Sequence, residues 1–217
     1  VVHPRCIRAA AATRTPVFIR DLNRRDIDGT RILSHLKGHS GVKTVTCQER
    51  MAVILLQNLD ARFQVGFLAE VFNTIRKRGV SVDLVATSET TTTVAINRDT
   101  NHLGDDELEG LAGDLSALCK VTLFQECVCV NLVGRGVRTA LGCLSSVMAF
   151  FDDRPLLMAS QSANDLSLSL LVEAGEHELL LRQAHRALIP PDDGSDDEVF
   201  GPGWDRMLSR ANCETER

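Results

Sequence analysis

Apolar positions in residues 51–125 follow the order of a small α+β unit. A continuous apolar run over residues 51–57 predicts a buried strand. Residues 66–78 carry apolar side chains at helical spacing and stop at Gly79, which predicts a helix. The next expected elements are a half-exposed strand at 80–84, a β-branched strand at 90–96, a helix at 105–118 and a strand at 120–125. The predicted order is β-α-β-β-α-β.

The same order returns further along the chain, and Ser88 matches Ser162 at an offset of about 74 positions. The elements expected in this second copy are a strand at 128–133, a helix at 137–151, a strand at 156–159, a strand at 166–170 and a helix at 177–188. A closing strand is missing from this copy, and residues 17–21 could supply it. We therefore predict two βαββαβ units, one inserted into the other, each with an antiparallel sheet and helices on one face.

The segments that flank these units are less regular. Residues 4–12 predict a short helix, and residues 16–20 predict a strand that begins at a proline. Residues 21–45 are polar, with a turn signal at Asp28-Gly29. After Leu188 the composition becomes that of an acidic linker, followed by a short Phe-Gly-Pro-Gly-Trp tail.

Composition restricts the possible functions. The chain has 217 residues, of which 44% are apolar, and a net charge of −5. This balance predicts a globular protein and argues against a nucleic-acid partner. No apolar run approaches the roughly 20 residues that span a bilayer, so we expect no membrane association. The chain begins without methionine, and we expect it to be part of a longer protein.

The seven cysteines have no spacing typical of a disulfide scaffold or a zinc site. Cys127 and Cys129 lie in an apolar strand, where buried free thiols of a cytoplasmic protein are the simplest interpretation. His35 and His39 are expected to be loop residues. We therefore predict no metal site.

Catalytic motifs are also missing. The sequence contains no Walker loop, no Gly-x-Ser-x-Gly and no His-Glu-x-x-His. Gly134-Arg-Gly136 lacks the third glycine of a dinucleotide fingerprint, so a tight strand-to-helix turn is expected there. We expect that the chain by itself is not an enzyme and that it needs no cofactor.

A binding site is easier to suggest. The turn over residues 62–68 enters a helix, whose free N–H groups suit a carboxylate, and Asp83 on the next strand would suit an ammonium group. Together they would match a free amino acid. The alternative is that Asp83 simply faces solvent on an alternating strand.

Residues 66–89 contain Gly-Phe-Leu-Ala-Glu-Val-Phe and Val-Ser-Val-Asp-Leu-Val-Ala-Thr-Ser-Glu. This region closely resembles the regulatory part of aspartate kinases, which is built of two ferredoxin-like ACT domains. The turn Met158–Asn164 resembles the corresponding turn of the second ACT unit. The resemblance extends over about residues 1–189. It implies a kinase-proximal segment at 1–50 that contributes to the second ACT domain, a first ACT domain at 51–125, the rest of the second at 126–189, and a tail at 190–217.

In this family the ACT domains bind a pathway end-product amino acid and inhibit the kinase. The resemblance implies lysine first and threonine next as the effector, bound where two chains form a homodimer. The implied effector-binding residues are Gln64, Gly66, Phe67, Leu68, Ser81, Val82, Asp83, Thr87, Ser88 and Glu89. Ala61 and Gln64 depart from the Met and Ser that lysine-sensitive members often carry.

The kinase signature Lys-Phe-Gly-Gly is absent, so the resemblance implies a fragment whose kinase domain, with its ATP and Mg, lies elsewhere in the parent chain. The tail would also fit a fusion to diaminopimelate decarboxylase, as in some bacterial members. Two alternatives remain: an ACT dimerisation module without effector binding, and a small enzyme on a ferredoxin-like fold.

Overall fold

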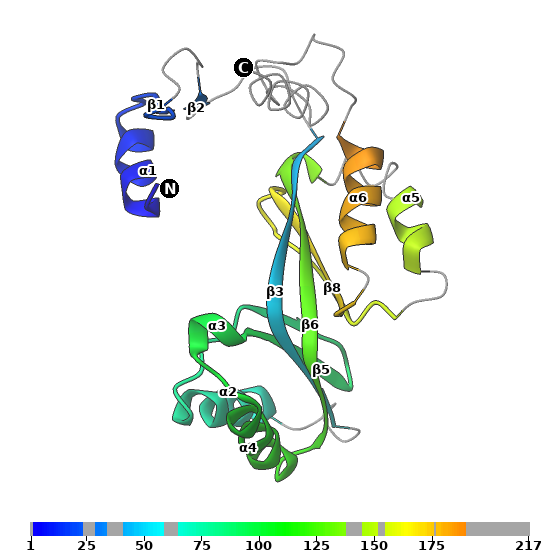
Figure 1. The fold of residues 1–217 in the computed structure, drawn as a ribbon. Helices are drawn as coiled ribbons and strands as arrows, with labels where there is room; N and C mark the ends of the chain where they lie inside the picture. Colours follow the sequence, from blue (N-terminus) through cyan, green and yellow to red (C-terminus); the bar gives the residue numbers. More distant parts are fainter. Residues whose placement is uncertain are drawn as a thin grey trace. The chain divides into compact units, whose positions relative to one another are not determined.

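A computed structural model describes residues 2–23, 29–33, 41–58, 65–137, 145–151, 155–175 and 177–189. The chain divides into two compact units, Val1–His39 and Ser40–Arg217. Each is described by itself (Figure 1).

The first unit contains one helix and a two-stranded sheet. Helix α1 (Pro4–Ala12) begins with proline, and His3 Nδ1 accepts a hydrogen bond from the Arg5 N–H at 3.2 Å. Strand β1 (Val17–Ile19) pairs antiparallel with β2 (Thr30–Ile32) in a sheet of their own. The prediction that residues 17–21 close the second repeat is therefore wrong.

The second unit contains a six-stranded antiparallel sheet with the strand order β4-β5-β3-β6-β8-β7. Its strands are β3 (Gly41–Gln57), β4 (Leu84–Thr87), β5 (Thr91–Asn97), β6 (Lys120–Arg135), β7 (Met158–Gln161) and β8 (Ser167–Glu173). Its helices are α2 (Phe67–Lys77), α3 (Arg98–Asn101), α4 (Asp105–Ser116), α5 (Ser145–Met148) with a 3₁₀ turn at Ala149–Phe151, and α6 (His177–Leu188).

Strands β3 and β6 are much longer than predicted. We expected two separate strands at 120–125 and 128–133, but β6 runs without a break through both. The strand that we expected from residues 17–21 is supplied by residues 41–48, which pair with the later part of β6. Register shifts between Val42 and Thr44 and between Gln48 and Met51 interrupt the alternation, which explains why this polar segment gave no strand signal.

The two long strands divide the sheet into halves. We call β4, β5 and residues 51–57 of β3 and 120–126 of β6 the first half. We call residues 41–48 of β3 and 127–135 of β6, with β8 and β7, the second half. In both, the outer strand pairs with the strand that follows it along the chain. Figure 1 shows α2 and α4 against the first half, and α5 and α6 against the second.

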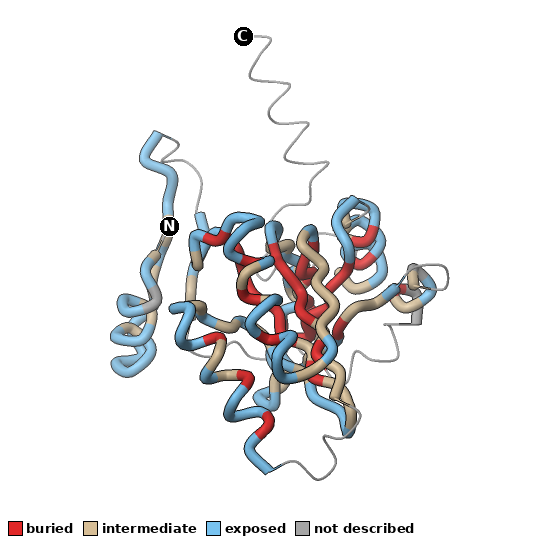
Figure 2. Tube along the Cα trace, turned by 90° about the horizontal axis from the view of Figure 1, so that it is seen from below, coloured by how far each residue is buried: buried red, intermediate tan, exposed pale blue. Residues whose placement is uncertain are grey.

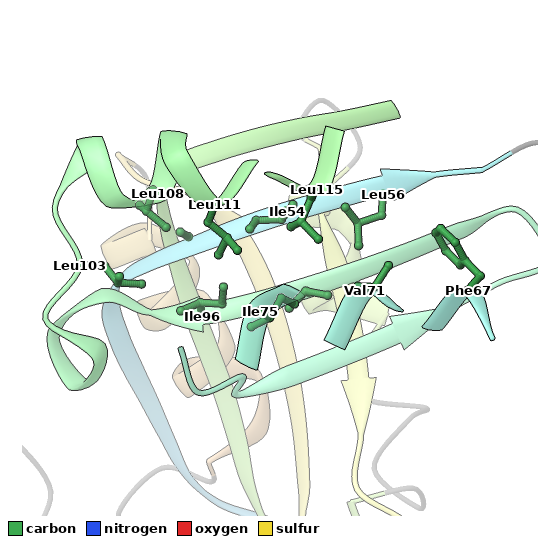
Figure 3. Packing of buried hydrophobic residues seen from close by; sticks show 12 residues of the cluster. Ile54, Leu56, Phe67, Val71, Ile75, Ile96, Leu103, Leu108, Leu111 and Leu115 are labelled. Carbon is green, nitrogen blue, oxygen red and sulfur yellow. The ribbon is translucent and has the colours of Figure 1, made fainter. Parts of the chain in front are cut away.

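Three apolar clusters stabilise this arrangement. One lies between α2, α4 and the first half (Figure 3), and one lies between α5, α6 and the second half. The third, here the shared core, joins side chains of both halves on the sheet face opposite the described helices; it includes Met51, Val53, Cys127, Met158 and Leu171. Buried residues accordingly follow the strands and the inner sides of the helices (Figure 2).

The helix patterns were mostly predicted. Phe67, Val71 and Ile75 of α2 are buried at a spacing of four, but Leu68, also in the expected stripe, is 41% exposed because it lies one helical step aside. The strand expected at 80–84 begins only at Leu84. The described part of the helix expected at 137–151 is short, and residues 138–144 lie outside the described residues. No described helix is both long and apolar enough to cross a membrane.

Candidate functional site

The start of α2 is the first part of the predicted site. Gly66 precedes the helix in a left-handed conformation (φ +94°), which favours glycine, and α2 has no side-chain cap. The first N–H groups of a helix have no partners inside it. Phe67 is buried in the apolar cluster, whereas Leu68 and the fully exposed Val65 face outward. Gln64, like His35 and His39, lies outside the described residues.

The segment Ser81–Asp83 is held against α3 by two asparagines. Asn101 Oδ1 accepts a hydrogen bond from the Ser81 N–H at 2.6 Å, and Asn101 Nδ2 donates to the Ser81 carbonyl at 3.0 Å. The exposed Asp83 carboxylate accepts a hydrogen bond from the Asn97 N–H at 2.7 Å. Val82 between them is half-buried and packs on the apolar cluster. The acid is therefore fixed in place while its outer side remains open.

The third part is the turn from β4 to β5. Thr87 ends β4, and the Ser88 N–H donates to the Thr91 carbonyl at 2.8 Å. The Ser88 hydroxyl also accepts a hydrogen bond from the Thr91 N–H at 3.2 Å. Glu89 is exposed in this turn. The hairpin is therefore closed by a Ser88–Thr91 pair.

Within one chain these three parts form two groups. Ser81, Val82 and Asp83 precede β4, whereas Thr87, Ser88 and Glu89 end it or follow it. Five strand residues span roughly 16 Å, more than a single amino acid. Figure 3 places Phe67, at the start of α2, beside Leu56, whereas Ile96 and Leu103 lie at the other end of the cluster. The α2 start therefore lies with the hairpin, away from Asp83.

The second half repeats this backbone with different side chains. The Asp83 N–H donates to the Ala95 carbonyl at 3.0 Å, and the Leu157 N–H donates to the Leu171 carbonyl at 3.0 Å, each just before the outer strand. Leu157 therefore occupies in the second half the position of Asp83 in the first. It packs against the shared core.

The turn from β7 to β8, the second hairpin, has Ser162 at the position of Ser88 in the first. The Ser162 N–H donates to the Ser167 carbonyl at 3.0 Å, and the Ser162 hydroxyl accepts from the Ser167 N–H at 3.0 Å, as Ser88 does with Thr91. The expected match of Ser88 with Ser162 is thus seen in the hydrogen bonds.

Cys127 and Cys129 behave as the interpretation of buried thiols predicts. Both are 1% exposed in the shared core. Burial raises the pKa of the Cys127 thiol to about 12 and that of the Cys129 thiol to about 11. Neither is a thiolate near neutral pH, so neither is a ready nucleophile.

One cluster was missed in the sequence. Ligand atoms of Cys47, Glu49 and His177 lie within 4.8 Å of one another. Cys47 and Glu49 are two residues apart on β3, but His177 follows 128 positions after Glu49, so no local spacing could reveal the cluster. It is the group of described residues that could hold a metal ion.

Comparisons with known proteins give similarity over most of the chain. No protein-family model matches the chain. The chain is 28% identical over 193 residues to lysine-sensitive aspartokinase 3 of Escherichia coli, covering 87% of this chain and 42% of that protein. It is 29% identical over 202 residues to the chloroplastic aspartokinase 2 of Arabidopsis thaliana, covering 88% of this chain and 37% of that protein.

The homologues of this chain are aspartokinases. They match it through their C-terminal regulatory part, so the chain spans less than half of their length. The structure of E. coli aspartokinase III in complex with lysine and aspartate superposes with a TM-score of 0.71 at 25% identity, covering 88% of this chain and 42% of that one. The α/β fold with its antiparallel sheet is thus similar to aspartokinase regulatory domains.

Proposed function

We propose that this chain is the regulatory region of an aspartate kinase. Its two sheet halves are two ferredoxin-like ACT domains that exchange strands through β3 and β6. The region binds an end-product amino acid, lysine first and threonine next, and the bound amino acid inhibits a kinase domain of the parent protein. That domain would use ATP and Mg in the cytoplasm to phosphorylate aspartate.

The observation that carries this proposal is the fixed, exposed carboxylate of Asp83 in a chain similar to lysine-sensitive aspartokinase 3. A hydrogen bond from Asn97 orients one carboxylate oxygen. Among the described residues no donor or cation binds the other oxygen, which could accept from an ammonium group. The Asn97 N–H also compensates part of the negative charge. The E. coli relative was solved with lysine and aspartate bound, which supports lysine as the first candidate.

A dimer explains how two separated groups could form one site. Strand β4 is the outer strand of the sheet, with β5 as its hydrogen-bonded neighbour. If β4 strands of two copies run antiparallel around a two-fold axis, Asp83 of one copy lies toward the α2 start and hairpin of the other. The effector's ammonium group would then meet Asp83, and its carboxylate would meet the N–H groups after Gly66 of the second copy.

Exposed apolar side chains also favour a dimer interface at β4 and the start of α2. Val65 is 100% exposed, Leu68 41% and Val85 38%, and all three belong to the α2 start or to β4. Exposed apolar residues on neighbouring elements are typical of an interface. A ligand that binds across it changes the balance between two arrangements of the dimer, which is the physical basis of inhibition.

Calorimetry with lysine and threonine, with aspartate as a control, tests the proposal. We expect saturable binding of lysine at one site per chain, and weaker binding of threonine. No heat with any amino acid for a folded dimer contradicts effector binding.

A kinase assay tests whether this chain is regulatory and the kinase activity belongs to another domain. The chain alone is expected to form no aspartyl phosphate from ATP and aspartate, because its sequence contains no phosphate-binding loop. Turnover by this chain contradicts the regulatory assignment.

The second candidate is an ACT dimerisation module that binds no effector. The exposed Val65, Leu68 and Val85 favour it as much as they favour a sensing dimer. A melting temperature that stays constant up to millimolar lysine and threonine, together with a stable dimer, supports this candidate, since a ligand selective for the folded state must raise that temperature.

A further inference from the structure

The kink of β3 brings two of its side chains together with that of the first residue of α6. Cys47 and Glu49 are separated by two positions on a strand, so their side chains share one face. Cys47 packs with the apolar cluster beneath α6, and the register shift between Gln48 and Met51 follows. His177 begins α6. The three side chains therefore meet where the two halves of the sheet join.

His177 is incompletely satisfied. Its Nε2 lies 3.6 Å from a Glu49 carboxylate oxygen. Its Nδ1 is buried and has no hydrogen-bond partner among the described residues, although the whole side chain is 21% exposed. Buried polar atoms nearly always have a partner, so an unpartnered one calls for a bound ion or water.

A weak ion pair does not account for the group. A Glu49–His177 pair gives the nearby thiol of Cys47 no role.

We propose that Cys47, Glu49 and His177 bind a divalent cation of the zinc class. Thiolate sulfur, imidazole nitrogen and carboxylate oxygen are the ligand types that Zn²⁺ takes in tetrahedral sites. A soft sulfur ligand with one carboxylate also argues against Mg²⁺ and Ca²⁺, which take oxygen ligands. The described residues supply three ligands, and water would supply the fourth.

The geometry requires only a small adjustment. Ligand atoms around a tetrahedral zinc ion lie roughly 3.3–3.6 Å apart, compared with at most 4.8 Å here. The Glu49 side chain is 70% exposed and free to rotate inward. The bound ion would connect the start of α6 to the kink of β3. This site is independent of the amino-acid site proposed above.

Cobalt titration of the metal-free chain tests the proposal, because a thiolate bound to Co²⁺ gives an intense ultraviolet charge-transfer band. We expect one equivalent to bind with this band, and Zn²⁺ to displace it and to raise the melting temperature. Cys47→Ser is expected to abolish the band, and His177→Ala to abolish or greatly weaken binding. Glu49→Gln is expected to weaken it less, because a water molecule can replace an exposed carboxylate.

Cys119→Ser is the matched control, since Cys119 is a half-buried thiol whose pKa burial also raises, but it packs in the first half. This variant is expected to bind Co²⁺ like the wild type. Circular dichroism without metal checks that each variant folds. If a variant does not fold, its binding test is replaced by X-ray absorption at the zinc edge of the zinc-loaded wild type. We expect this spectrum to show one sulfur ligand. No binding by the wild type, an equal band in Cys47→Ser, or a zinc spectrum without sulfur overturns the proposal.

Discussion

The first and second halves of the sheet share a strand order but differ at one position before the outer strand. Asp83 and Leu157 donate equivalent backbone hydrogen bonds to the neighbouring strand. Asp83 is exposed and holds an open carboxylate, whereas Leu157 packs into the shared core. Equal backbone pairing thus leaves side-chain chemistry free to diverge, and of these two positions it is Asp83 that can bind an ammonium group.

The largest expected effect tests whether the halves are separate. Leu111 of α4 and Leu180 of α6 are both fully buried, one in each helix-covered cluster. Leu111→Ala and Leu180→Ala are each expected to lower the free energy of unfolding by about 2–5 kcal/mol. Because β3 and β6 run through both halves, both variants should shift one common denaturation transition. Two transitions, with each variant moving a different one, would show that the halves unfold independently.

The next effect concerns the difference between Asp83 and Leu157. Asp83→Asn keeps an acceptor for the Asn97 N–H but removes the charge, and it is expected to weaken lysine binding by about 1.5–3 kcal/mol, since hydrogen bonds to charged groups are worth about this much. Leu157→Ala, at the equivalent position of the second half, is expected to leave lysine affinity unchanged. Calorimetry measures both. Equal affinities for wild type and Asp83→Asn would remove Asp83 from the site.

A smaller effect compares the two hairpins. Ser162 is half-buried, and its hydroxyl accepts hydrogen bonds from the Leu166 and Ser167 N–H groups, whereas the exposed Ser88 hydroxyl accepts from the Thr91 N–H. Ser162→Ala and Ser88→Ala are expected to cost about 0.5–1.5 kcal/mol each, with the larger loss for Ser162. Urea denaturation measures the two losses. A larger loss for Ser88 would contradict this ranking.

The smallest effect depends on pH. Arg78, just after α2, donates a hydrogen bond to Asp114 of α4 at 2.7 Å and lowers the pKa of that carboxyl below its ordinary value of 3.8. A lowered pKa in the folded state stabilises the fold above pH 3.8, and this contribution disappears as pH falls through the lowered value. Because both groups are exposed, the stabilisation is small and is screened by salt.

Asp114→Asn is therefore expected to unfold slightly more easily than wild type near pH 7. The difference should vanish at acidic pH, as followed by thermal melting. Glu178→Gln, which removes the looser Arg182–Glu178 pair of α6 at 3.7 Å, is the second-half control and should change less. A difference for Asp114→Asn that persists below the lowered pKa would mean that the charge is not its cause.

Local patterns predicted most elements but could not predict how strands are shared. The helical stripes of α2, α4 and α6 are visible because the buried residues recur every three or four positions. The extension of β3 to Gly41 is hidden, since a bulge between Val42 and Thr44 interrupts the alternation. Nothing local indicated that β3 and β6 would each serve both halves.

The residues of the proposed amino-acid site were predicted from the sequence, but their arrangement in space was not. Asp83 and Gly66 were identified from neighbouring residues and from the family resemblance. That Asp83 lies at one end of β4 and the start of α2 at the other depends on how the elements pack. The Cys47, Glu49 and His177 cluster was not predicted, because a strand kink and a distant helix start meet only in the folded chain.

A crystal structure of the chain grown with lysine would show where the effector binds. We expect lysine at the outer edge of β4, with an ammonium group on Asp83 and its carboxylate on the N–H groups that follow Gly66 of a second copy. Lysine bound instead beside Leu157 in the second half, or an empty β4 edge at saturating lysine, would rule out effector binding at Asp83.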